Sequence, residues 1–323
     1  MLFRLCHRAP HPQNLLLTSL RTQNFSTRHG RNLSHEPVKL AYTAVIPENG
    51  NTTEKPLVIL HGLFGSKRNW GSFLKAFSRD MPDRPIYALD LRNHGTSPHT
   101  TPMTYEAMAK DVHHFVEEKN LQEVQLLGHS MGGKVAMAYA LSSPEKLSRL
   151  IIADITPSIG QLSDEFLQYI SLMKKIEDMP QGAIKTRSDA DKILSSHESD
   201  MSVRQFLLTN LHIPSASRTA SQSSDERVKF IVPLDTLSQF ISELGSFPYE
   251  YNAATGTVPV RWEGPTLAVK GTKSPFINHK NIPIMRSFFP NVQIEELDTG
   301  HWVHAERPTD FRKLVVEFLS RSS

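Results

Sequence analysis

The stretch Leu126-Leu127-Gly128-His129-Ser130-Met131-Gly132-Gly133 decides the fold. It contains the pattern Gly-x-Ser-x-Gly, directly after a run typical of a strand (124–127) and before a helical pattern (132–141). In that context the serine occupies a sharp turn that exposes its hydroxyl at the end of a sheet, and the flanking glycines avoid collisions with the neighbouring backbone. A serine that only capped the helix would not need both glycines. We therefore predict that Ser130 is a nucleophile.

Short strand-like runs alternate with helical patterns on both sides of this stretch. The predicted strands are 38–46, 56–60, 85–90, 124–127, 150–153, 265–269 and 292–297. Outside the central segment, helical spacing occurs at 70–77, 104–119, 132–141, 282–289 and 308–319. Such alternation is typical of a mostly parallel central sheet with helices on both faces. The sequence thus predicts an α/β fold over residues 38–323, and together with the serine turn it resembles the α/β-hydrolase fold.

The alternation stops in the middle of the chain. Residues 157–255 carry helical patterns, at 166–176, 203–211 and 234–244, separated by a Ser/Thr-rich stretch at 215–226 without hydrophobic periodicity. We interpret 157–255 as a helical lid, inserted after the strand that ends at Asp154, and 215–226 as a mobile loop.

Composition excludes several classes of protein. The chain has 323 residues, of which 39% are hydrophobic and 21% charged, which suits a globular domain with a substantial core. No run approaches the roughly 18 apolar residues that a transmembrane helix needs. Cys6 is the only cysteine, so a disulfide scaffold is excluded, and a formal net charge of +3 gives no sign of a nucleic-acid partner.

The first 35 residues differ from the rest in charge. They contain five arginines and no acidic residue, with leucines that could share one side of a short helix. These features predict a mitochondrial transit peptide over residues 1–33, cleaved before Ser34, and a location in the matrix. A disordered basic tail is the alternative. Without the five arginines, 31 basic and 33 acidic residues remain, or about −2, so the basic character belongs to the leader.

The general base must be chosen among 15 histidines. In α/β-hydrolases it follows the last strand, in the chain order serine, acid, histidine. His301 follows the predicted strand 292–297 and meets this requirement, with His304 as its nearest rival. Four histidines that precede the nucleophile are interpreted as loop contacts or surface residues: His61, His94, His113 and His114.

The acid that orients the histidine is less obvious. Its usual place, after the strand 265–269, holds no carboxylate but includes Ser274. The strand after the nucleophile helix ends at Asp154, at the same edge of the predicted sheet. We predict that Asp154 orients His301 and stabilises the imidazolium, with Ser274 in support. The alternative is that Asp154 only caps the first turn of the lid.

An acyl-transfer site also needs two donors for the oxyanion. We expect them to be the backbone N–H of Met131, next to the nucleophile, and that of Leu63 in the segment His61-Gly62-Leu63-Phe64-Gly65. Phe64 and Trp70 could wall the acyl pocket or belong to the core. We find no metal-ligand spacing, phosphate loop or dinucleotide fingerprint. We therefore expect no metal and no cofactor, and acyl-CoA only as a substrate.

Several longer motifs make the chain resemble a mitochondrial abhydrolase subgroup that includes fungal ethanol acetyltransferases and similar bacterial esterases. The motifs are His61–Ser66 with Asn69-Trp70, Asp90–Gly95 with Ser97-Pro98-His99, Gly128–Lys134, Asp154–Pro157, and Gly300–Ala305 with Arg307-Pro308. The resemblance implies that Asp154 is the acid and that short acyl esters and thioesters are substrates. It also implies that an acyl group can pass from acetyl-CoA to ethanol instead of water.

The leading hypothesis is a serine hydrolase of short-chain acyl esters or thioesters that forms an acyl-enzyme on Ser130. The second is an alcohol O-acetyltransferase that makes ethyl acetate from acetyl-CoA and ethanol with the same triad. The third is an inactive binding protein on the same fold. An intact Ser130, His301 and oxyanion segment disfavour the third hypothesis.

Overall fold

A seven-stranded sheet organises the part of the chain that the structure, a computed structural model, describes: residues 36–48, 50–160, 164–214 and 227–321. The strand order is β1-β3-β2-β4-β5-β8-β9, and only β1 is antiparallel to its neighbour. The strands are β1 Tyr42–Val45, β2 Leu57–Leu60, β3 Ile86–Leu89, β4 Val124–His129, β5 Leu147–Ala153, β8 Thr266–Gly271 and β9 Val292–Leu297.

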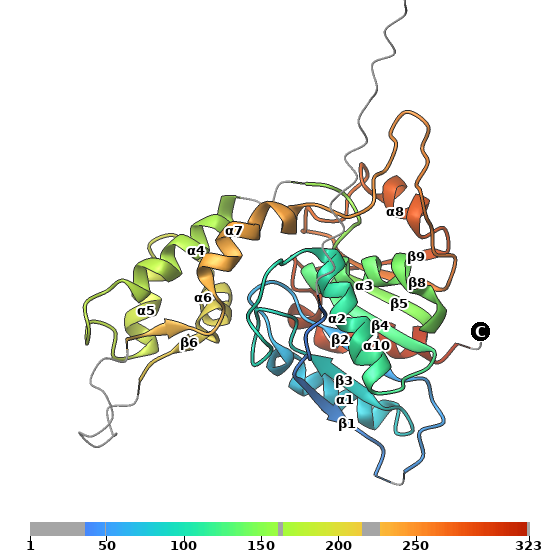
Figure 1. Cartoon of the computed structure of the whole chain (residues 1–323), viewed down its shortest axis with the longest axis horizontal. Coiled ribbons are helices and arrows are strands. Elements are labelled where there is room, and N and C mark those ends of the chain that lie inside the picture. Colours follow the sequence, from blue (N-terminus) through green and yellow to red (C-terminus); the bar gives the residue numbers. More distant parts are fainter. Residues whose placement is uncertain (1–35, 49, 161–163, 215–226, 322–323) are drawn as a thin grey trace, which may run out of the picture. The chain divides into compact units, whose positions relative to one another are not determined.

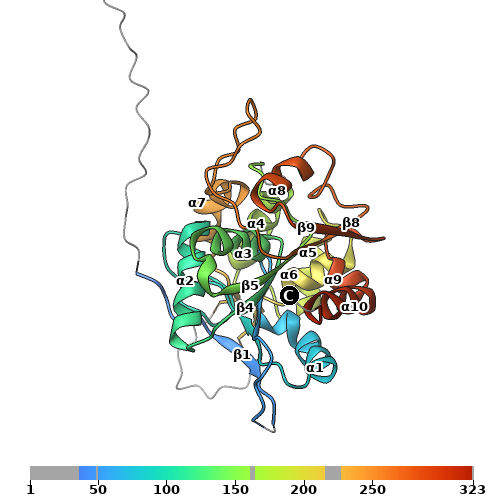
Figure 2. The same ribbon diagram turned by 90° about the vertical axis from the view of Figure 1, so that its right-hand side faces the viewer.

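Helices cover both faces of this sheet (Figures 1 and 2). The helices α1 (Gly71–Asp80) and α10 (Pro308–Leu319) pack on one face, and α2 (Tyr105–Glu118) and α3 (Met131–Ser142) pack on the other. The domain also contains four short helices: η1 (Lys67–Trp70), η2 (Pro144–Lys146), α8 (Ile282–Phe288) and α9 (Val303–Glu306). None of the helices in the described ranges is long and apolar enough to cross a membrane.

Alternating side chains of the buried strands build two separate cores. In β2, Leu57 and Ile59 join the cluster beneath α1 and α10, whereas Val58 and Leu60 join the cluster beneath α2 and α3. All four side chains are fully buried. A strand buried on both faces is apolar at nearly every position, which explains the continuous run in the sequence. The mostly parallel sheet between two layers of helices confirms the predicted α/β architecture.

Local signals fix several element ends. The Thr104 hydroxyl accepts a hydrogen bond from the Ala107 N–H and begins α2 where a capping residue was expected. The predicted bounds of β9 and α10 match the structure. The predicted first strand, 38–46, is shorter because only residues 42–45 pair with β3.

The segment between β5 and β8 forms a helical group on one side of the sheet (Figure 1). It contains α4 (Asp164–Glu177), α5 (Arg187–Leu194), α6 (Met201–Leu208), the two-residue strands β6 (Leu211–His212) and β7 (Lys229–Phe230), and α7 (Leu234–Gly245). We call residues 157–246 the insertion. The expected helix 203–211 ends earlier than predicted, because Leu211 pairs with Phe230 in a hairpin. The predicted transit peptide and the predicted loop 215–226 lie outside the described residues, and a lid function of the insertion stays a prediction.

Candidate active site

The predicted site residues follow the carboxyl ends of neighbouring parallel strands. Ser130 follows β4, Asp154 follows β5, Ser274 lies three residues after β8 and His301 four residues after β9. Because β4, β5, β8 and β9 are adjacent and parallel, all four residues lie at one edge of the sheet. This edge is where open α/β sheets bind ligands.

Ser130 lies on the strained turn that the motif predicts. Its backbone angles are φ 53° and ψ −119°, and its N–H donates to the Ala153 carbonyl at 3.1 Å. The turn is tight enough that a Cβ on Gly128 would lie 2.2 Å from the Gly132 carbonyl oxygen, and one on Gly132 would lie 2.5 Å from that of His61. Both glycines are therefore required by close backbone approach, and Ser130 stands at the amino end of α3.

Asp154 and His301 are hydrogen-bonded to each other. His301 Nδ1 lies 2.8 Å from Asp154 Oδ2, and the Asp154 carboxylate is fully buried. The Gly271 N–H donates to Asp154 Oδ1 at 3.0 Å, and the Ser274 hydroxyl donates to Oδ2. The carboxylate thus binds three groups that lie at or after the ends of β8 and β9. This arrangement differs from the alternative of a helix cap, and Ser274 is hydrogen-bonded to the acid.

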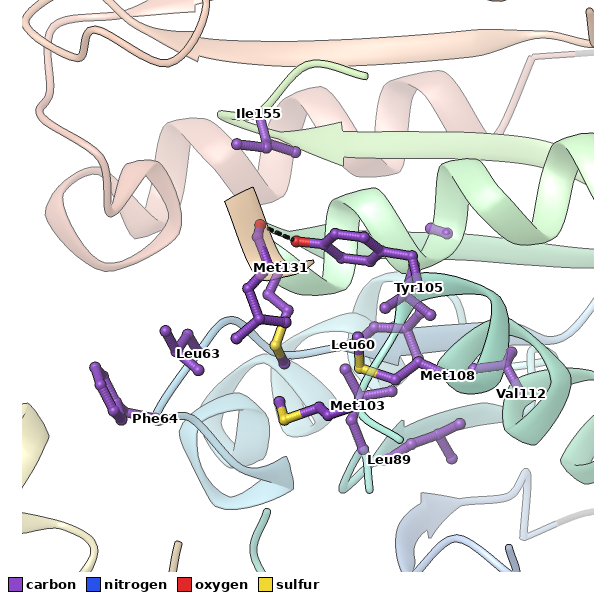
Figure 3. Packing of buried hydrophobic residues seen from close by; sticks show 14 of the residues in the cluster. Leu60, Leu63, Phe64, Leu89, Met103, Tyr105, Met108, Val112, Met131 and Ile155 are labelled. Atoms are coloured by element: carbon purple, nitrogen blue, oxygen red, sulfur yellow. Dashed lines mark hydrogen bonds between the residues drawn. The ribbon is translucent and has the colours of Figure 1, made fainter. Parts of the chain in front are cut away.

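The segment expected to supply an oxyanion donor lies against the nucleophile. A Cβ on Gly62 would lie 3.3 Å from Ser130 Cβ. Neither the Leu63 N–H nor the Met131 N–H donates a hydrogen bond within the described ranges. The side chains of Leu63 and Met131 belong to one buried cluster (Figure 3), which anchors both backbone segments.

The other histidines near the site are buried and structural. His129 Nε2 contacts the His301 carbonyl oxygen at 3.0 Å, and the His304 ring stacks on Trp70 with centroids 4.6 Å apart. Desolvation lowers the pKa of His129 well below its usual range and that of His304 to about 3. These two rings are therefore neutral at physiological pH. His61 and His94 are also buried, in the loops after β2 and β3, whereas His113 and His114 lie half-buried in α2.

A cavity of about 490 Å³ opens onto these groups. Ser130 and His301 both line it, together with Phe64 and Trp70. The insertion contributes an apolar wall from α4, α6 and the end of α7, formed by Phe166, Tyr169, Val203, Phe206, Leu207 and Leu244. Cavities of this size and character suit small organic ligands with an apolar part.

Lys134 connects α3 to both ends of the insertion. Its ammonium donates to the carbonyl oxygens of Ser158 (3.1 Å), Gly245 (3.1 Å) and Ser246 (2.8 Å). Only 5% of the residue is exposed, and desolvation lowers the pKa of Lys134 to about 8. The helix α3, which follows Ser130, is therefore hydrogen-bonded to the chain at both ends of the insertion.

Two contacts of the site carry no signal in the sequence. The first is the set of hydrogen bonds from Lys134 to the insertion. Lys134 belongs to the motif Gly128–Lys134, but nothing in the sequence indicates which carbonyl groups it binds. The second is Asn210, whose amide donates to the Phe64 carbonyl at 2.7 Å across 146 positions of sequence. Over the described ranges, no group of three His, Cys, Asp or Glu side chains could hold a metal ion.

Comparison with known proteins identifies the family of the chain. Residues 55–308 match the family described as alpha/beta hydrolase fold. The chain belongs to this family. It is an enzyme of the α/β-hydrolase superfamily, which confirms the resemblance drawn from the motifs.

Named relatives include a lipase, an acetyltransferase and an esterase. The chain is 36% identical to an sn-1-specific diacylglycerol lipase ABHD11 from Danio rerio, over 88% of this chain and 83% of that protein. It is 33% identical to a probable alcohol acetyltransferase from Saccharomyces cerevisiae, over 88% and 84%. A solved structure titled marine microorganism esterase superposes with a TM-score of 0.74 at 30% identity, over 87% of this chain and 99% of that chain.

Proposed function

We propose that this protein is a serine hydrolase of short-chain acyl esters or thioesters that works through an acyl-enzyme. The observation that carries the proposal is the 2.8 Å hydrogen bond between His301 Nδ1 and buried Asp154, with His301 and Ser130 lining the same cavity. A histidine held through Nδ1 presents Nε2 as the base. This is the arrangement that activates a serine hydroxyl.

The steps follow from these positions. Ser130 Oγ attacks the acyl carbonyl while His301 Nε2 takes its proton, and Asp154 stabilises the imidazolium. The N–H groups of Leu63 and Met131 bind the oxyanion. His301 then protonates the leaving alcohol or thiol, and water hydrolyses the acyl-enzyme by the same sequence. The chemistry uses side chains and backbone N–H groups alone, so acyl-CoA enters as a substrate and no cofactor is required.

The second candidate is transfer of the acyl group to an alcohol, as in an alcohol O-acetyltransferase that makes ethyl acetate. The apolar wall that the insertion adds to the cavity favours it, because an acyl-enzyme shielded from water survives until an alcohol binds. The name of the yeast relative points the same way. The name of the zebrafish relative adds diacylglycerol esters to the substrates worth testing.

The test supplies purified protein with acetyl-CoA, with and without ethanol, and quantifies free CoA, acetate and ethyl acetate. Acetate alone establishes hydrolysis, and ethyl acetate in excess of acetate establishes the transferase. A panel of short-chain and diacylglycerol esters follows if acetyl-CoA is not turned over. Ser130→Ala is the control, and turnover that survives it would refute the serine mechanism and leave a binding role.

We also propose that residues 1–33 direct the protein to the mitochondrial matrix. Five arginines and no acid in this stretch support the proposal. Fusion of residues 1–40 to a fluorescent protein tests it: mitochondrial import with processing near Leu33 is expected. A cytosolic fusion would leave the basic tail without a targeting role.

A further inference from the structure

Asn210 joins the insertion to the segment that supplies one oxyanion donor. It lies between α6 and β6, and its side-chain Nδ2 donates to the Phe64 carbonyl oxygen at 2.7 Å. Only 4% of the residue is exposed. Its own backbone is held by hydrogen bonds to Leu207, at 3.1 Å, and from Ile231, at 2.8 Å. The amide is therefore carried by a part of the insertion whose backbone is hydrogen-bonded to residues on both sides of it.

Phe64 occupies a strained position in a tight turn. The Gly65 N–H donates to the Gly62 carbonyl at 2.9 Å, which closes the turn, and Phe64 is its third residue with φ 60°. That conformation favours glycine, so a bulky side chain there is maintained only by surrounding contacts. The turn needs external support to keep this shape.

The support comes from two sides. The Phe64 N–H donates to Nε2 of buried His94 at 3.3 Å, and the Phe64 carbonyl accepts from Asn210. Burial lowers the pKa of His94 to about 3, so the ring is neutral. Its Nδ1 donates to the Arg92 carbonyl oxygen at 3.0 Å, which leaves Nε2 as the acceptor. His61 Nδ1 additionally contacts the Gly62 carbonyl at 2.8 Å, on the same peptide as the Leu63 N–H. His94 and His61 therefore support the turn from the domain, and Asn210 supports it from the insertion.

The insertion holds Phe64 a second time through its side chain. The Phe64 ring stacks on Phe166 of α4, with centroids 6.3 Å apart. In Figure 3 this ring points away from Leu89, Met103 and Met108, although all four residues belong to one large buried cluster. The turn is thus packed into the domain through Leu63 and into the insertion through Phe64.

We propose that Asn210 is a positioning residue, which aligns the Leu63 N–H for the oxyanion by fixing the Phe64 carbonyl. The inference rests on the proposed function and extends it, because it makes docking of the insertion a condition of fast acyl transfer. A merely structural amide would satisfy a buried carbonyl and stabilise the fold. A positioning amide changes transition-state stabilisation more than substrate binding.

The experiment compares the full-length wild type with Asn210→Ala and with Asn210→Asp, which keeps the shape and loses the donor. Three quantities are measured with p-nitrophenyl acetate: kcat, KM and the inhibition constant of a trifluoromethyl ketone, whose hemiketal oxygen occupies the oxyanion site. We expect kcat to fall about 10- to 100-fold, less than for complete removal of a donor. The inhibition constant rises in parallel, and KM changes less than about threefold.

Asp200→Ala is the matched control. Asp200 is exposed and caps α6, the helix that precedes Asn210. Its carboxylate accepts a hydrogen bond from the Ser202 N–H at 2.7 Å. Its loss weakens α6 without touching Phe64, so kcat and inhibitor binding should stay at wild-type values. Equal losses in this control, or a fall in kcat with unchanged inhibitor affinity, would overturn the positioning role.

Two further variants keep the outcomes separate. If Asn210→Ala does not fold, Asn210→Ser, whose shorter side chain does not reach the Phe64 carbonyl oxygen, carries the comparison: kcat and inhibitor affinity must again fall together, and unchanged values refute the inference. Ser130→Ala tests the proposed function itself. Wild-type activity that is lost in Ser130→Ala but untouched in every Asn210 variant refutes only the positioning role, whereas activity that survives Ser130→Ala refutes both.

Discussion

Replacing Lys134 by methionine should change how stability depends on pH. The buried ammonium has its pKa lowered from the ordinary 10.5 to about 8, because burial removes the charge from water. Between these two values the unfolded chain binds more protons than the folded chain, so the folded state gains stability as pH rises. Below pH 8 both states carry the charge, and its burial destabilises the fold by about 3 kcal/mol.

The size of the effect follows from the two pKa values. Integrated from about pH 7 to about pH 9.5, the lysine contributes a gain of about 2 kcal/mol to the free energy of unfolding. Tyr105, whose ring lies 5.5 Å from the ammonium, has a pKa raised above 10 by burial and titrates outside this window. The gain should therefore appear in the difference between wild type and Lys134→Met, in which contributions from other groups cancel.

Urea unfolding followed by tryptophan fluorescence at several pH values measures this difference. Lys192→Met removes an exposed lysine from the same insertion and should give a difference that does not vary with pH. A flat profile for Lys134→Met would refute the reasoning. A falling profile would show that the carbonyl hydrogen bonds outweigh desolvation, so that the folded protein prefers the ammonium more than the unfolded chain does.

Three predictions concern the triad. Asp154→Asn should lower kcat by about 10⁴, because the amide holds the wrong tautomer of His301; near-wild-type turnover in a steady-state ester assay would move the acid role elsewhere. Ser274→Ala should lower kcat/KM about tenfold, since it removes one of three hydrogen bonds to the carboxylate; a loss as large as that of Asp154→Asn would contradict a supporting role. His301→Ala should abolish labelling by a fluorophosphonate, whereas His304→Ala, which removes a ring stacked on Trp70, should leave labelling intact; the reverse pattern would exchange the two histidines.

Much of the fold and of the site could be predicted because the signals are local. A strand buried on both faces needs a continuous apolar run, and Leu57–Leu60 has one. The nucleophile turn needs glycines at fixed distances from Ser130, and Gly128 and Gly132 occupy them. The topology then brings Asp154 and His301 together, because adjacent parallel strands end at one edge.

The insertion was harder to predict because its contacts are distant in sequence. The helix α5, Arg187–Leu194, is short and was missed, and Leu211 continues a helical pattern but pairs in a hairpin. Asn210 is an ordinary polar residue until the fold brings it to Phe64. A single hydrogen bond between segments far apart in the sequence produces no hydrophobic periodicity from which it could be predicted.

The hydrogen bond from Ser274 to Asp154 also shows that two strands give access to the base. Both side chains reach the same point from the ends of two adjacent strands, β5 and β8. The place after β8 is where α/β-hydrolases usually carry the acid, so this chain shows the usual position occupied by a hydroxyl. Ser274 Oγ and His301 Nδ1 both contact Asp154 Oδ2, so side chains from the ends of both strands meet beside the base. Either strand therefore offers a place from which a side chain can support His301 while Ser130 stays where it is.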